Sequence, residues 1–186
     1  PLAQFAELID PRAGYRDGAR VMFDPDSLPH QLHAPLAAAS IEPVPAPCPV
    51  TAMKALKNDA ELAGTRRAHV EDGAAMVRFL TWLDSGAAHG MRETAIAEHL
   101  LTLRRERPRF LASSFETICG SGPNGAIVHY RAIPGQDSVL VEDSLLLVDS
   151  GAHYNDGTTD ITRTMAIGTP TAAMINAFTA VLRGHI

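Results

Sequence analysis

The stretch Leu145–Thr164, which reads LLLVDSGAHYNDGTTDITRT, decides how this chain is interpreted. Leu145 to Val148 form an apolar run of strand length, and the letters NDG at 155–157 are a strong turn signal. Residues 158–164 then alternate β-branched with polar side chains, as a second strand does. The stretch therefore predicts a β-hairpin with Asp149 on one arm and Asp160 on the other.

The spacing of these two aspartates predicts that their carboxylates lie close together. A two-residue loop at 154–155 would set Asp149 opposite Asp160, whereas a three-residue loop ending at Gly157 would need a bulge to bring them together. Two such charges about 5 Å apart repel by roughly 3 kcal/mol at an effective dielectric near 20. A divalent cation would turn this repulsion into attraction, so the pair predicts half of a metal site. The alternative is that these are solvated strand residues and that Asp156 only forms the turn.

Several motifs in the chain resemble those of the aminopeptidase P family, metallopeptidases with the "pita-bread" fold. The letters VDSGA at 148–152 and DGTTDITRT at 156–164 are similar to the family's first two metal-ligand segments. The letters GSGPNGAIVHY at 120–130 resemble its glycine-rich strand, which ends in a His-Tyr pair. The helix start KNDAE at 57–61 and the closing FTAVLRGHI at 178–186 also match.

The resemblance is strong over residues 50–186 and weak over the first 45 or so, and it is closest to the three-domain, cytosolic type of the family. It implies an α+β fold in which residues 46–186 are the N-terminal half of a pita-bread catalytic domain. Residues 1–45 would then be the C-terminal part of a non-catalytic, creatinase-N-like α/β domain with its linker.

The resemblance also implies a site. Asp149 and Asp160 would bind two divalent metal ions, of which Mn²⁺ is expected, although the ligand chemistry also permits Co²⁺ or Zn²⁺. His129 would face the substrate as a catalytic residue without binding metal, and a metal-adjacent role for His153 stays open. The family's remaining ligands, a histidine and two glutamates, come from a second half that these 186 residues lack. We therefore expect the chain to be a fragment that is inactive alone.

The activity implied for the intact protein is release of the N-terminal residue from peptides with proline in second position. A cytoplasmic homodimer is expected, with no nucleic-acid or membrane partner. Three alternatives remain, which are a prolidase-like hydrolase, a metal-free creatinase-like relative and a non-catalytic truncated fragment. The retained Asp149 and Asp160 argue against the metal-free relative.

Composition excludes several other classes of function. The net charge is −5 and the 16 basic residues are scattered, which argues against a nucleic-acid surface. No apolar run approaches the ~20 residues that span a bilayer. Cys48 and Cys119 form neither a disulfide framework nor a zinc-ligand spacing, so we expect two free thiols.

Local signals predict the remaining elements. A long helix follows Asn58, which forms a capping box with Glu61, and a second helix covers residues 93–106. The long helix is expected to bury a stripe at helical spacing, made of Leu62, His69, Val70, Gly73, Met76, Val77, Leu80 and Leu83. Strands are expected at 19–23, 110–117, 126–130 and 139–141, and a stiff extended connector at 42–52. A last helix, capped by Thr169, is expected to bury Met174, Phe178, Val181 and Leu182.

Overall fold

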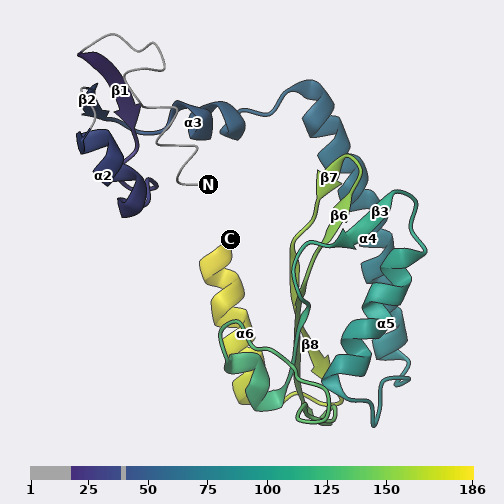
Figure 1. The fold of residues 1–186 in the computed structure, drawn as a ribbon. Coiled ribbons are helices and arrows are strands. Elements are labelled where there is room, and N and C mark those ends of the chain that lie inside the picture. The colour runs from purple at the N-terminus through teal and green to yellow at the C-terminus, as the bar shows by residue number, and fades with distance from the viewer. Residues whose placement is uncertain (1–17, 39–40) are drawn as a thin grey trace. The chain divides into compact units, whose positions relative to one another are not determined.

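The computed structural model describes residues 18–38 and 41–186. The chain divides into two compact units between Lys57 and Asn58 (Figure 1). The sequence places a domain boundary after residue 45, and the assignment of the first part to a separate domain stays a prediction.

The first unit contains a short parallel strand pair. Strand β1 (Ala19–Phe23), which the sequence predicts, pairs with β2 (Ile41–Pro45), and helix α2 (His30–Ala38) lies between them in the chain. Helix α3 (Pro49–Ala55) follows and begins with a proline, the residue that needs no hydrogen bond at a first helical position. The extended connector predicted at 42–52 is therefore wrong in part, because it contains the end of a strand and most of a short helix.

The second unit is built from two helices, two three-stranded sheets and a last helix (Figure 1). The helices α4 (Asp59–Asp84) and α5 (Glu93–Arg105) pack together on one side of the strands. One sheet has the order β4 (Ile118–Ser121), β5 (Ser144–Ser150), β8 (Ile161–Ile167). The other has the order β3 (Phe110–Ser113), β6 (Ala152–Tyr154), β7 (Gly157–Thr158). This mixture of helices and antiparallel strands confirms the α+β class.

Helix α4 begins as predicted and buries only part of the predicted stripe. The Asn58 side chain accepts a hydrogen bond from the Glu61 amide, and the Glu61 carboxylate accepts one from the Asn58 amide, which completes the capping box. Val70 and Val77 of the predicted stripe are largely exposed. Met76 and Leu83 are buried as predicted. The other buried residues of α4 were not predicted and are Gly64, Ala68, Asp72, Ala75 and Phe79. In the first half of the helix these are small residues and one aspartate, because the hairpin and α5 approach it closely.

The core lies between these helices and the sheet β4-β5-β8. Helix α5 contributes Ile96, Leu100 and Leu103, all buried as predicted. Strand β5 alternates buried and partly buried residues, and its Leu146 and Val148 face the helices. Cys119 on β4 is a free thiol in this core, where burial, with the charges of Glu93 and Asp137, raises its pKa to about 12.

The predicted hairpin is present, with a shifted register. Strand β5 pairs with β8 so that Asp149 lies opposite Thr162, and β6 pairs with β7 so that His153 lies opposite Thr158. The loop is therefore Asn155–Asp156, one position later than the two-residue loop the sequence suggests. Asp149 and Asp160 are consequently not directly opposite each other, and that prediction is wrong by two positions.

The glycine-rich segment differs from its prediction. Residues 122–126 form a 3₁₀ helix, η2 (Gly122–Ala126), which is followed by a turn, so the predicted strand at 126–130 is wrong. The predicted strand at 139–141 is a single bridge between Val139 and Arg92. Strand β4, which precedes η2, was not predicted because its Cys-Gly-Ser letters look like loop.

The last helix, α6 (Ala172–His185), lies on the side of the sheet away from α4 and α5 (Figure 1). Its cap is Thr171, which accepts a hydrogen bond from the Met174 amide, and not Thr169 as predicted. None of its residues is buried, contrary to the prediction, and a cavity of about 230 Å³ lies between it and the strands β5 and β8.

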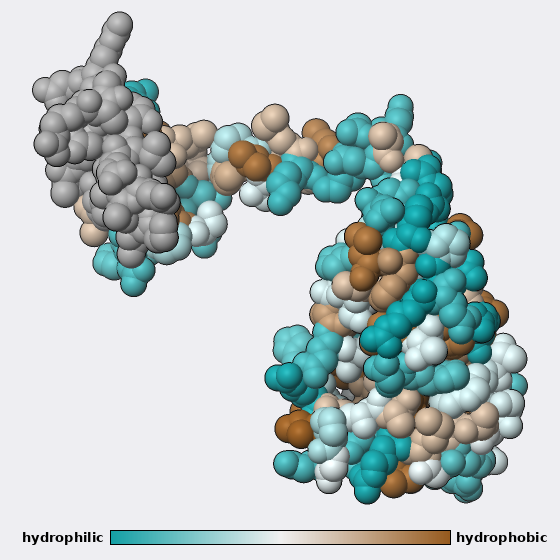
Figure 2. Space-filling view, turned by 45° about the vertical axis from the view of Figure 1, so that its right-hand side comes forward, coloured by the Kyte–Doolittle hydropathy of each residue, from teal (hydrophilic) through white to brown (hydrophobic). Residues whose placement is uncertain are grey.

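On the face of the second unit shown in Figure 2, apolar residues are scattered among hydrophilic ones. Among the residues that the structure describes, no helix has the length and apolar character needed to cross a membrane.

Candidate functional site

The two predicted metal ligands lie on one face of the long hairpin. Residues opposite each other, and residues two apart on one strand, point to the same side of a sheet. Asp149 is opposite Thr162, and Asp160 is two residues before Thr162. The two carboxylates are therefore diagonal neighbours on one face. Because Leu146 and Val148 point into the core, Asp149 points away from α4 and α5, toward the side on which α6 lies.

Both carboxylates are accessible. Asp149 is partly buried and Asp160 is exposed. The Thr162 hydroxyl donates to Asp149 Oδ1 at 2.8 Å. Across residues 18–38 and 41–186, neither carboxylate forms an ion pair with a basic side chain. Two accessible carboxylates without a cationic partner fit a hard divalent ion.

The described residues contain no cluster of three or more His, Cys, Asp and Glu side chains that could hold a metal ion. The assignment of Asp149 and Asp160 as metal ligands, completed by ligands from outside these residues, stays a prediction.

His129 lies on the turn after η2, exposed, with a φ of 55°. Non-glycine residues seldom adopt this left-handed conformation, which histidine tolerates better than most, and such residues cluster at functional sites. The glycine-rich segment packs against the sheet face that carries Asp149, since Gly125 contacts Leu147, two residues earlier on β5. The structure places His129 on a conformationally restricted turn, not on the strand that the sequence suggested.

A buried carboxylate fixes the turn that carries His129. Glu93, at the start of α5, accepts hydrogen bonds from the amide of Ser121 at 2.7 Å, the side chain of Asn124 at 2.9 Å, the hydroxyl of Tyr130 at 2.7 Å and the amide of Ser138 at 3.0 Å. Burial, with the hydrogen bond to Glu93, raises the pKa of Tyr130 to about 12. Since Tyr130 follows His129 directly, Glu93 holds both flanks of the turn.

A second buried carboxylate lies under the hairpin. Asp72 of α4 forms an ion pair with Arg104 of α5, with 2.7 Å between Asp72 Oδ1 and Arg104 Nε. The hydroxyls of Tyr154 and Thr159 donate to the same carboxylate. Sequence reasoning missed this cluster. The available signal was an aspartate at helical spacing from Ala68, Ala75 and Met76, which makes it a polar residue on a face of small side chains.

His153 is exposed on β6, and its Nδ1 lies 2.9 Å from the Thr158 hydroxyl. It points to the opposite side of the hairpin from its two neighbours Ala152 and Tyr154, which are buried. No described contact links it to Asp149 or Asp160.

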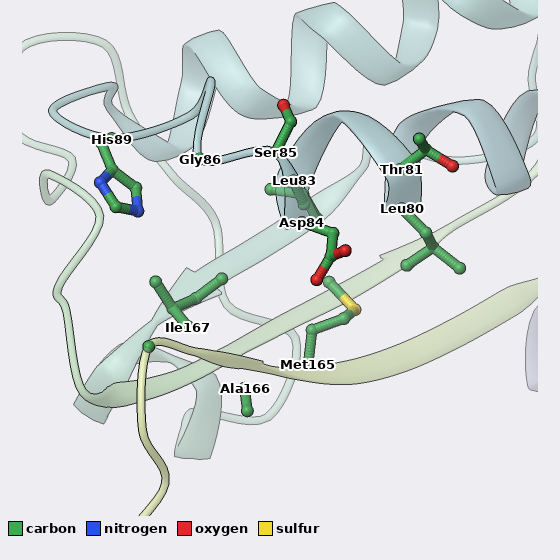
Figure 3. Close-up of a pocket in the computed structure, with 11 residues that line it drawn as sticks. Leu80, Thr81, Leu83, Asp84, Ser85, Gly86, His89, Met165, Ala166 and Ile167 are labelled. Atoms are coloured by element: carbon green, nitrogen blue, oxygen red, sulfur yellow. The ribbon is translucent and has the colours of Figure 1, made fainter.

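A cavity of about 760 Å³ in the second unit lies elsewhere. Its walls are the last turns of α4, the following loop and the end of β8, with Leu80, Asp84, His89 and Met165 among its lining residues (Figure 3). Asp160 precedes the other end of β8, and neither carboxylate nor His129 lines this cavity.

Comparison with known proteins agrees with this geometry. Residues 63–186 match the metallopeptidase family M24. A probable Xaa-Pro aminopeptidase P of Laccaria bicolor is 46% identical over 140 residues, which cover 74% of this chain and 22% of the relative. Aminopeptidase P2 of Arabidopsis thaliana is 45% identical over 140 residues, covering 74% of this chain and 20% of the relative. The chain thus spans about a fifth of the length of these curated relatives.

Solved structures give the same result. The X-prolyl aminopeptidase of Caenorhabditis elegans, described as a cytosolic enzyme with a di-nuclear active site, superposes with a TM-score of 0.83 at 31% identity. The match covers 99% of this chain and 30% of that one. A prolidase of Thermococcus sibiricus shares the fold, with a TM-score of 0.74 at 23% identity over 98% of this chain and 48% of that one. The pita-bread architecture expected from the sequence is confirmed, and the chain belongs to the metallopeptidase family M24.

Proposed function

We propose that the complete protein carrying this chain is a metal-dependent aminopeptidase that releases the N-terminal residue from peptides with proline in second position. The observation that carries the proposal is the pair Asp149 and Asp160, accessible on one hairpin face without a basic partner in the described chain. The likeness to proteins named Xaa-Pro aminopeptidase P, at 43–46% identity, supports this substrate class over a prolidase, whose fold is shared at 23% identity.

In this proposal Asp149 and Asp160 hold two divalent ions together with ligands from outside these 186 residues, and we expect Mn²⁺. When bound, two such ions would supply an activated water molecule for attack on a peptide carbonyl and would stabilise the charge that develops there. The hydrogen bond from Thr162 fixes the orientation of Asp149 before metal binds. A cytoplasmic location, supported by the cytosolic enzyme of Caenorhabditis elegans, and a homodimer belong to the same proposal.

His129 is assigned to substrate, as a group that donates a hydrogen bond to the carbonyl oxygen as charge develops. Its exposure on a turn with fixed flanks supports this assignment. The separate role of residues 1–45, as the end of a non-catalytic domain, is also part of the proposal.

The first test is hydrolysis of an Xaa-Pro-Xaa peptide by the complete protein after EDTA treatment and again after Mn²⁺ is added. We expect activity to disappear and return. Asp160→Asn should abolish the response to Mn²⁺, whereas Asp84→Asn, an exposed aspartate at the far cavity, should leave it unchanged. Full activity in EDTA, or none with any metal, would contradict the proposal.

The second test separates His129 from the metal ligands. His129→Ala should lower kcat about 10²- to 10³-fold while metal content stays constant. His69→Ala, which changes another exposed histidine, on α4, is the matched control and should leave kcat unchanged. Unchanged turnover in His129→Ala would remove this residue from the mechanism.

A further inference from the structure

The buried pair Asp72–Arg104 occupies an unusual place for a structural ion pair. Both side chains are almost completely buried, at 0% and 1% exposure. The pair is bidentate, with Arg104 Nε 2.7 Å from Asp72 Oδ1 and Arg104 Nη2 3.0 Å from Asp72 Oδ2. Such pairs have a rigid planar geometry, so whatever they hold is held in a defined position.

What this pair holds is the hairpin, between the two candidate metal ligands. The Thr159 hydroxyl donates to Asp72 Oδ2 at 2.8 Å and accepts from the Ala152 amide at 3.0 Å. Tyr154 donates its hydroxyl to Asp72 Oδ1 at 3.1 Å. Thr159 directly precedes Asp160 in the sequence. The carboxylate of Asp72 therefore binds the residue next to a proposed metal ligand.

The other arm of the hairpin is held at the same level. Arg104 Nη1 lies 3.5 Å from the carbonyl oxygen of Gly151, two residues after Asp149. Ser114 joins the two arms, because its amide donates to the Gly151 carbonyl at 3.1 Å and its hydroxyl donates to the Thr159 carbonyl at 3.1 Å. At Gly151 a methyl group would overlap the Thr159 carbonyl and the Ser114 hydroxyl. The backbone beside Asp149 and the backbone beside Asp160 are therefore both held by hydrogen bonds with Asp72, Arg104 and Ser114.

We propose that Asp72 and Arg104, acting through the Thr159 hydroxyl, are positioning residues for the metal centre: they set the separation of Asp149 and Asp160 before any ion binds. The inference rests on the proposed metal site. Groups that orient metal ligands in this way commonly change metal affinity 10- to 100-fold when they are replaced.

A purely structural ion pair is the competing explanation, and the chain contains a matched example of one. Glu71, next to Asp72, pairs with Arg107, just beyond α5, with 2.6 Å between Glu71 Oε2 and Arg107 Nη2. This pair joins α4 to the segment that follows α5, and it has no described hydrogen bond to the hairpin. Its replacement tests helix packing without changing the metal-ligand segments.

The experiment titrates Mn²⁺ alone into the metal-free complete protein by calorimetry, with bound ion counted by EPR and folding checked by circular dichroism. Thr159→Val removes the connecting hydroxyl without leaving a buried charge, and Thr159→Ser restores it. Thr94→Val is the matched control, since the Thr94 hydroxyl donates to Asp137 at 2.7 Å, away from the hairpin. Arg104→Lys keeps the positive charge and removes the planar guanidinium that forms two hydrogen bonds with Asp72.

We expect about tenfold weaker Mn²⁺ binding in Thr159→Val and in Arg104→Lys, with recovery in Thr159→Ser. Thr94→Val and Glu71→Gln should bind as the unaltered protein does. Unchanged Mn²⁺ affinity in folded Thr159→Val, or equal loss in Glu71→Gln, would overturn the positioning role and leave the proposed function intact. No Mn²⁺ binding by the unaltered protein, or unaltered binding in Asp160→Asn, would overturn the proposed function as well.

Discussion

Asp72 and Glu93 are both fully buried and both accept four hydrogen bonds, yet their charges are compensated in different ways. Asp72 takes two of its bonds from the guanidinium of Arg104. Glu93 takes all four from neutral amide and hydroxyl groups, and it also sits at the positive end of the α5 dipole.

The difference follows from what each carboxylate holds. Asp72 connects two helices to the hairpin that carries Asp149 and Asp160. Glu93 collects backbone and side-chain donors from the end of β4, from η2, from the turn after it and from Ser138. Replacement of Asp72 leaves a buried cation without its partner, whereas replacement of Glu93 leaves buried neutral donors without an acceptor. The two replacements therefore lower the free energy of unfolding by different amounts.

The largest expected effect is that of Asp72→Asn. It leaves Arg104 buried beside a neutral amide, so the free energy of unfolding should fall by about 3–5 kcal/mol. Urea denaturation with circular dichroism measures this change. Glu71→Gln, in the partly exposed neighbouring pair, should cost no more than about 1 kcal/mol. Equal losses of unfolding free energy in the two variants would show that the buried pair contributes no more to stability than the partly exposed one.

Glu93→Gln should lower the free energy of unfolding by a smaller amount, about 1–3 kcal/mol. The NH₂ group of the glutamine replaces one accepting oxygen, so some of the buried donors are left without a partner. Glu98→Gln on the same helix is the control, since the exposed pair Glu98–Arg105 contributes little. A loss in Glu93→Gln larger than that in Asp72→Asn would reverse the comparison.

The smallest effect concerns protonation of Tyr130. Burial, together with the hydrogen bond to Glu93, raises its pKa to about 12 from the ordinary 10. The raised pKa contributes stability that is complete below about pH 10 and is lost as the pH rises through about 12. Alkaline titration of phenolate absorbance in a Tyr154→Phe background should show this late step, and Glu93→Gln should move it toward lower pH. A Tyr130 step already near pH 10 would mean that Glu93 does not hold the hydroxyl.

The parts predictable from sequence were those with local signals. The capping box of α4, the buried side of α5 and the existence of the hairpin each depend on neighbouring residues, and all three are confirmed. The candidate metal ligands Asp149 and Asp160 lie on one face because side chains alternate along the two arms of the hairpin. Their register was not predictable, because it depends on which loop the chain adopts after it packs on α4.

The errors share a physical cause. The buried face of α4 was misjudged because close packing favoured Ala68, Ala75 and Asp72 over Val70 and Val77. Such a preference arises from distant segments, here the hairpin and Arg104. The turn at His129 was mistaken for a strand because the Glu93 contacts that shape it come from another part of the sequence.

The contact between the hairpin loop and α4 has a consequence for how the protein can vary. At Gly64 of α4 a methyl group would overlap the carbonyl oxygen of Asp156, so the backbone of the loop lies directly on the helix, and the Asp156 carboxylate also pairs with Arg67 of α4 at 2.8 Å. Surface loops usually accept insertions, but an added residue here would either lift the loop from the helix or slip one arm and turn Asp160 away from Asp149. We therefore expect the ten intervening residues to keep a constant number among natural variants that retain metal-dependent activity, even where their side chains diverge.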